Sequence, residues 1–117
     1  MLHNPKAFES FARLDFNRLR MEDEWRRVLY GAIAFLDRVG WIQHDDGDVR
    51  WGICASMAMR CAAYDPALGL ETPGKSWIKA AQKFCTWAHV TDVPAYNDAY
   101  GRTKEEVQAA LRACAEQ

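Results

Sequence analysis

The residues around His44 are the side chains in this sequence that most resemble metal ligands. The oxygen, nitrogen and sulfur donors in question are His44, Asp45, Asp46, Asp48 and Cys54. Zinc sites usually show paired Cys or His ligands separated by only a few residues. A calcium loop instead needs alternating oxygen ligands, a central Gly and a terminal Glu. Neither pattern is present, so the stretch is interpreted as a solvated turn and no metal site is expected.

Two Cys–His pairs are close enough in sequence to be considered as nucleophile and base. Cys54 follows His44 by ten residues, and Cys85 precedes His89 by four, which places that pair on one helical face. A nucleophilic thiol must be activated by a base within reach. Cys85 also lies on an apolar face, where burial raises the pKa of a thiol. Catalysis by either pair is not expected, and the chain is interpreted as a non-enzyme.

The tripeptide Gly74-Lys75-Ser76 precedes a predicted helix, as the end of a phosphate-binding loop would. The complete motif G-x-x-x-x-G-K-[ST] requires a further Gly upstream, and this chain lacks it. A helix N-terminus can still bind an anion. Ser76 is more simply interpreted as a helix cap, and no cofactor is expected.

A polar turn near the end of the chain is the remaining candidate site. Asn97 and Asp98 suit a turn because their side chains bond to nearby backbone, and Gly101 can adopt positive φ. Asp98 and Arg102 are spaced to form a charge-assisted hydrogen bond across the turn. The favoured interpretation is a structural joint, and the alternative is a recognition site formed by Asn97, Asp98 and Arg102.

The charge balance argues against a chain built for nucleic acid. There are 15 Lys and Arg residues against 16 Asp and Glu residues, and non-specific nucleic-acid binding depends on neutralising several phosphates. Nucleic acid remains possible without being indicated. Lys75, Lys79 and Lys83 recur every four residues as a basic stripe. The other candidate basic face contains Arg13, Arg18, Arg20, Arg26 and Arg27.

Length, cysteine usage and hydropathy indicate one reduced, cytoplasmic domain. A chain of 117 residues with 50% hydrophobic residues can bury a core without staples. Its four Cys residues form no Cys-x-x-Cys and are expected to be free. The first residues lack the layout of a signal peptide, and no apolar run is long enough to span a membrane.

The hydrophobic spacing predicts a mainly α fold, a bundle of four to five helices with a small β-hairpin after the second. Gly31, in the middle of the second helix, costs about 1 kcal/mol relative to Ala, which indicates the close approach of another backbone. The expected elements are a short helix over 5–14 in an N-terminal extension (1–20), a helix ending at Gly40, a hairpin over 41–51, and helices over 53–63, after Ser76 and over 104–115.

Two of these elements have specific sequence signals. Asp46-Gly47 predicts a two-residue hairpin turn, which would place Ile42 opposite Trp51 and Gln43 opposite Arg50. Thr103 is expected to cap the last helix, with Glu106 completing a capping box.

The chain resembles a small bacterial and phage family of unknown function over roughly residues 25 to 115. The matching pieces are Tyr96-Asn97-Asp98, Gly101-Arg102-Thr103 leading into Glu105-Glu106-Val107, Gly40-Trp41 with Gln43, and the helix of small residues from Cys54 to Ala63. This chain differs in having Tyr96 where Trp is usual, and in its N-terminal extension from Met1 to about Glu24. The resemblance implies a compact helical fold and carries no assigned chemistry.

The leading functional hypothesis is a non-enzymatic protein–protein interaction module, such as a stoichiometric inhibitor or adaptor of the kind phages direct at host defence complexes. It rests on the absence of a catalytic set, the near-neutral charge and the aromatic content, since surplus Trp and Tyr often anchor interfaces. The alternatives are a small nucleic-acid-binding regulator, or a small-ligand protein or enzyme with a pocket near Gln43, Arg50 and Asn97. The expected partner-binding residues are Trp87, Tyr100, Asn97, Asp98 and Arg102, of which Trp87 and Tyr100 are expected to be exposed aromatics.

Overall fold

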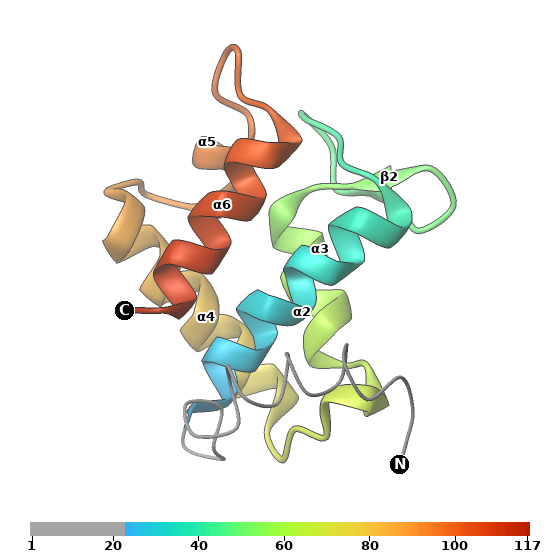
Figure 1. The fold of residues 1–117 in the computed structure, drawn as a ribbon, viewed down its shortest axis with the longest axis vertical. Coiled ribbons are helices and arrows are strands. Elements are labelled where there is room, and N and C mark those ends of the chain that lie inside the picture. Colours follow the sequence, from blue (N-terminus) through green and yellow to red (C-terminus); the bar gives the residue numbers. More distant parts are fainter. Residues whose placement is uncertain (1–22) are drawn as a thin grey trace, which may run out of the picture.

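A long amphipathic helix, α2 (Glu24–Val39), lies among the other helices in the computed structural model, which describes residues 23–117 (Figure 1). Trp25, Leu29 and Leu36 repeat at helical spacing and are buried, so this face packs against α3, α4 and α6. Gly40 ends the helix as predicted, at φ 108°, and its N–H donates to the Leu36 carbonyl at 2.9 Å. The helix predicted over 5–14 lies outside the described residues.

The predicted hairpin after the second helix is confirmed, but its register is not. Strand β1 (Gly47–Asp48) pairs antiparallel with β2 (Gly52–Ile53), with Gly47 opposite Ile53 and Asp48 opposite Gly52. The turn is formed by residues 49–51, where the Trp51 N–H donates to the Asp48 carbonyl at 3.0 Å. The predicted turn at Asp46-Gly47 is therefore wrong.

Close backbone packing explains the shift of the hairpin register. A Cβ atom added at Gly47 would clash with the Gly52 carbonyl oxygen, so Gly47 serves a strand contact and not a turn. The Asp48 carboxylate meanwhile stabilises the observed turn by accepting the Arg50 N–H at 2.9 Å and the Arg50 guanidinium at 3.0 Å. Because the turn lies at residues 49–51, the predicted pairings of Ile42 with Trp51 and of Gln43 with Arg50 are also wrong.

Helix α3 (Ala55–Ala63) follows the hairpin directly and crosses α2 at Gly31. The Cys54 sulfur caps its N-terminus by accepting the Met57 N–H at 3.4 Å. A Cβ atom at Gly31 would lie 2.9 Å from the Ala62 Cβ, so the close approach at this glycine is made by the side chain of another helix and not by its backbone. Two small residues thus allow the two helices to pack tightly.

Helix α4 (Pro73–Ala88) begins before Ser76, so the predicted Ser76 cap is wrong. Thr72 is the N-cap residue and Pro73 occupies the first turn, where its missing N–H is harmless. The preceding segment contains a short 3-10 helix, η2 (Pro66–Leu68). Ser76 is buried, and its hydroxyl donates to the Glu24 carboxylate at 2.6 Å.

The chain ends with the short helix α5 (Val93–Asn97) and with α6 (Lys104–Ala115), which packs against α2. The predicted capping box is confirmed, because the Glu106 N–H donates to Thr103 Oγ1 at 3.1 Å and the Thr103 N–H to Glu106 Oε1 at 3.0 Å. Over residues 23–117 the structure thus contains five α-helices and a two-stranded hairpin, which confirms the predicted mainly α fold.

Candidate binding site at the Tyr100 turn

The side chain of Asn97 lies at the centre of a joint between α5, α3 and the segment after α2. It is fully buried. Its Oδ1 accepts hydrogen bonds from Trp41 Nε1 at 2.6 Å and from the Ala55 N–H at 3.0 Å. Its Nδ2 donates to the Ile42 carbonyl at 3.0 Å and to Asp98 Oδ1 at 2.9 Å. A buried amide with every polar atom paired fixes the relative positions of its partners.

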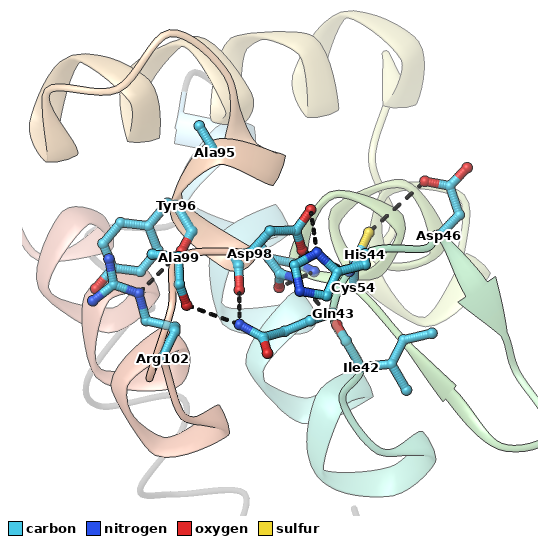
Figure 2. A network of polar contacts seen from close by, with 12 residues as sticks. Ile42, Gln43, His44, Asp46, Cys54, Ala95, Tyr96, Asp98, Ala99 and Arg102 are labelled. Atoms are coloured by element: carbon cyan, nitrogen blue, oxygen red, sulfur yellow. Dashed lines mark hydrogen bonds and ion pairs between the residues drawn. The ribbon is translucent and has the colours of Figure 1, made fainter.

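Gln43, in the segment after α2, also bonds to the backbone at this joint. Figure 2 shows its side chain directed at the backbone that follows α5. Its Nε2 donates to the carbonyls of Asn97 and Ala99, at 3.1 and 3.0 Å. The two amides, which are 54 residues apart in sequence, therefore hold the segment at 41–44 against the turn at 98–102, hereafter the Tyr100 turn.

Asp98 is bonded to His44. Its Oδ1 accepts the His44 N–H at 2.8 Å, and its Oδ2 lies 4.0 Å from His44 Nδ1. The bond holds the backbone of His44 in the left-handed region, at φ 66°. Partial burial raises the pKa of Asp98, but the hydrogen bonds from His44 and Asn97 outweigh it, so the pKa lies below its ordinary value.

Arg102 binds within its own turn and not to Asp98, so the predicted Asp98–Arg102 pair is wrong. Its Nε donates to the Tyr96 carbonyl at 3.0 Å, and its guanidinium lies 3.7 Å above the Tyr96 ring (Figure 2). Its N–H donates to the Ala99 carbonyl at 3.0 Å. Asp98 and Arg102 each strengthen the joint through a different partner.

The ring of Tyr100 projects from this joint into solvent. Its exposure reaches 105% of the reference value, which confirms the predicted exposure. The turn around it is held by the Ala99 carbonyl, which accepts hydrogen bonds from Gln43 Nε2 and from the Arg102 N–H. The arrangement presents an aromatic side chain on a backbone that is already ordered, which suits recognition of another molecule.

Trp87 does not share this exposure. It is half-buried and packs on Phe84, with ring centroids 5.9 Å apart, so the prediction that it is exposed is wrong. Among residues 23–117, two further aromatic side chains are exposed without having been predicted so, Trp51 at 65% and Tyr64 at 59%. Both follow from local structure, since Trp51 lies in the corrected hairpin turn and Tyr64 caps α3.

The thiols are poorly placed for nucleophilic chemistry. Burial raises the pKa of Cys54, Cys61 and Cys85 above the ordinary thiol value, and it raises that of Cys114 to about 11. The Cys54 sulfur is also engaged as a helix cap and lies 3.9 Å from Asp46 Oδ1. A thiol that stays protonated at neutral pH is a weak nucleophile.

The other sequence-predicted groups are dispersed. Among residues 23–117 there is no cluster of three or more His, Cys, Asp or Glu side chains suited to hold a metal. The small-ligand hypothesis placed Arg50 with Gln43 and Asn97, but Arg50 bonds to Asp48 instead and stacks on Trp51.

The described residues of the two candidate basic faces are either bonded to backbone carbonyls or exposed along α4. Arg26 donates to the carbonyls of Ala115 and Gln117, and Arg27 to that of Leu68. Lys75, Lys79 and Lys83 are exposed along α4. Arg13, Arg18 and Arg20 lie outside the described residues, so the structure does not place the Arg-rich face as a whole.

Two polar partnerships escaped the sequence analysis. Trp41 was singled out only as part of a resemblance, and Gln43 was also placed near Arg50 and Asn97 in a ligand pocket, but the hydrogen bonds of both to Asn97 were not predicted. Glu24 is only 5% exposed and accepts hydrogen bonds from Glu71, Thr72 and Ser76. No local pattern marks either set, because the partners are tens of residues apart in the chain.

The fold and the joint define a small α-helical domain that carries one short hairpin and an exposed aromatic turn. The chain belongs to a family of unknown function, DUF6197, which matches residues 21–117. No curated protein and no solved structure matches it. Within the described part of the chain, no helix combines the length and apolar character needed to cross a membrane.

Proposed function

We propose that this protein is a non-enzymatic binding module that contacts another protein through the Tyr100 turn. The observation that carries the proposal is the full exposure of Tyr100 on a turn that is hydrogen-bonded to Gln43 and Arg102 through the Ala99 carbonyl. An ordinary exposed loop gains order only on binding, at an entropic cost. Here the backbone is ordered in advance, which favours affinity.

The chemistry of the turn also favours a protein partner. Tyr and Arg are enriched among the residues that dominate binding energy at protein interfaces. Tyr100 offers a rigid ring with a hydroxyl, while Asp98, with a lowered pKa, supplies a carboxylate that is ionised at neutral pH. His44, whose side chain is 73% exposed, lies against this carboxylate at the edge of the surface.

A protein that acts by occupying a partner's surface needs no catalytic group. A stoichiometric inhibitor or adaptor in the cytoplasm, such as those that phages direct at host defence complexes, would use a surface of this kind. The raised pKa values of the four thiols support a binding role over nucleophilic catalysis.

The experiment compares Tyr100→Ala with Tyr64→Ala. Each change removes an exposed Tyr, at 105% and 59% exposure respectively, so neither is expected to alter folding. Tagged full-length protein is used to capture a partner from native lysate, and the purified partner is then titrated against each variant. Tyr100→Ala should weaken binding at least roughly tenfold, as expected for an interface anchor, and Tyr64→Ala should not. Equal binding by both variants, or capture of no stoichiometric partner, would refute the proposal.

A further inference from the structure

A cleft of about 500 Å³ lies between α2, α4 and α6, and none of its lining residues belongs to the Tyr100 turn. Its volume falls within the range of small-molecule sites. The residues relevant to its chemistry are Trp25, Arg26, Lys79, Lys83, Trp87 and Cys114. It therefore combines two indole rings with three cationic side chains.

Arg26 is a fixed positive charge at one side of this cleft. Its Nη1 donates to the Ala115 carbonyl at 2.6 Å and to the Gln117 carbonyl at 2.8 Å. Its guanidinium lies 4.5 Å from the centre of the Trp25 ring. Its acidic neighbour Asp23 is 3.8 Å from Nε. Because Arg26 is held at several points, its charge is positioned without a ligand.

Two lysines on α4 add mobile charge to the same cleft. Lys83 Nζ lies 5.1 Å from the centre of the Trp25 ring, so one indole carries both Lys83 and Arg26. Lys79, one helical turn earlier, is exposed and also lines the cleft. Cys114 adds no negative charge, because burial raises the pKa of its thiol to about 11 even though Arg26 and Lys83 lower it. Three cationic side chains, those of Arg26, Lys79 and Lys83, therefore line this cleft.

The indoles have different roles. Trp25 is only 6% exposed, and its ring forms the base of the cleft, with Arg26 and Lys83 lying over it. Trp87 is half-buried against Phe84 and offers the accessible part of its ring as an apolar wall. A ligand that complements both features has an anionic group for the lysines and a flat ring for Trp87. Lys acts on such an anion as a point charge, and aromatic stacking accepts any planar base.

We propose that this cleft is a binding site for a small planar anion of nucleotide size, held by Lys79 and Lys83 with its ring against Trp87. A nucleoside monophosphate has both parts of this chemistry, a phosphate and a planar base. Binding is non-covalent and does not depend on the protein contact proposed at Tyr100.

The test is calorimetric titration of the full-length protein with adenosine 5′-monophosphate at low ionic strength. Adenosine alone supplies the ring, and inorganic phosphate alone supplies the charge. The proposal predicts one saturable site for the nucleotide, at least roughly tenfold tighter than for either part, because a charge-assisted contact and a stacking contact act together. Added salt should weaken it by screening. No saturable binding, or phosphate binding as tightly as the nucleotide, would overturn it.

Matched lysine variants locate the site. Lys79→Met and Lys83→Met should each weaken nucleotide binding roughly tenfold, the effect of losing one charge-assisted contact. Lys75→Met removes a charge from the same exposed stripe but outside the cleft lining, and should leave affinity unchanged. All three lysine variants are checked for a native circular dichroism spectrum. If Lys83→Met is unfolded, the nucleotide affinity of Lys79→Met alone tests the location of the site. An equal effect of Lys75→Met would refute the site, whereas Tyr100→Ala should bind the nucleotide normally, so the two proposals fail separately.

Discussion

Replacing Asn97 with Ala should destabilise the joint that orders the Tyr100 turn. The substitution removes the acceptor of the Trp41 indole N–H and of the Ala55 backbone N–H, and the donor to the Ile42 carbonyl. Ala55 is fully buried, so its N–H gains no water in exchange. Trp41 is half-buried, and its indole N–H is closer to solvent.

The expected decrease in the free energy of unfolding follows from the hydrogen bonds that these partners lose. A buried polar group left without its hydrogen bond costs about 1–3 kcal/mol. The unpaired Ala55 N–H is assigned the full cost, and the less buried Trp41 and Ile42 groups the low end of this range. With the packing lost at a fully buried side chain added, we expect Asn97→Ala to lower the free energy of unfolding by about 3–5 kcal/mol. Small domains have a total of roughly 5–15 kcal/mol, so the variant should be barely stable.

Urea unfolding followed by circular dichroism and by Trp fluorescence measures this loss. The matched control is Gln82→Ala, which removes an exposed amide and should change the free energy of unfolding by less than about 0.5 kcal/mol. An Asn97→Ala loss below about 1 kcal/mol with an unchanged denaturant slope would show that the buried amide contributes no more than a surface one, and the structural account of the joint would be wrong.

Substitutions at Glu24 and Gly31 should also change the stability of the fold. Burial raises the pKa of Glu24, but hydrogen bonds from Ser76, Glu71 and Thr72 outweigh it, so the folded-state pKa is lowered. The stability it contributes is therefore present above the unfolded carboxyl pKa and is lost as pH falls through the folded value. In urea unfolding, the free energy of unfolding of the wild type should exceed that of Glu24→Gln at neutral pH, and the difference should disappear on acidification. A difference that does not depend on pH would contradict this. Gly31→Ala should gain about 1 kcal/mol in helix propensity, yet its Cβ would lie 2.9 Å from that of Ala62. We expect a net loss of about 1–2 kcal/mol from overpacking, and a double-mutant cycle with Ala62→Gly should show strong coupling.

The sequence predicted the elements whose signals are local. The capping box needs only Thr103 and Glu106, and the end of α2 needs only Gly40. The hairpin register failed because Asp46-Gly47 is a strong local turn signal, while the deciding contact is between Gly47 and Gly52. Ser76 was misassigned in the same way, since its hydroxyl is bonded to Glu24, 52 residues away.

Three residues of the joint carry a local sequence signal, but the hydrogen bonds that they make do not. Asn97, Asp98 and Arg102 were all singled out, and all belong to the joint. Their partners were not foreseeable, because Asn97 bonds to Trp41 across 56 residues and Asp98 to His44 across 54. Spacing reveals which side chains share a helix face, whereas contacts between distant segments depend on how the whole chain packs.

The bond from Ala55 to Asn97 also affects how this domain opens. The first N–H groups of an α-helix have no partner within the helix and ordinarily exchange with solvent early. At Ala55 the acceptor is a side chain on another helix, 42 residues further along the chain. Protection of this amide against hydrogen exchange therefore depends on the docking of α5 more than on the integrity of α3. Deuterium uptake at Ala55 consequently reports separation of the two helices, even while each of them remains helical.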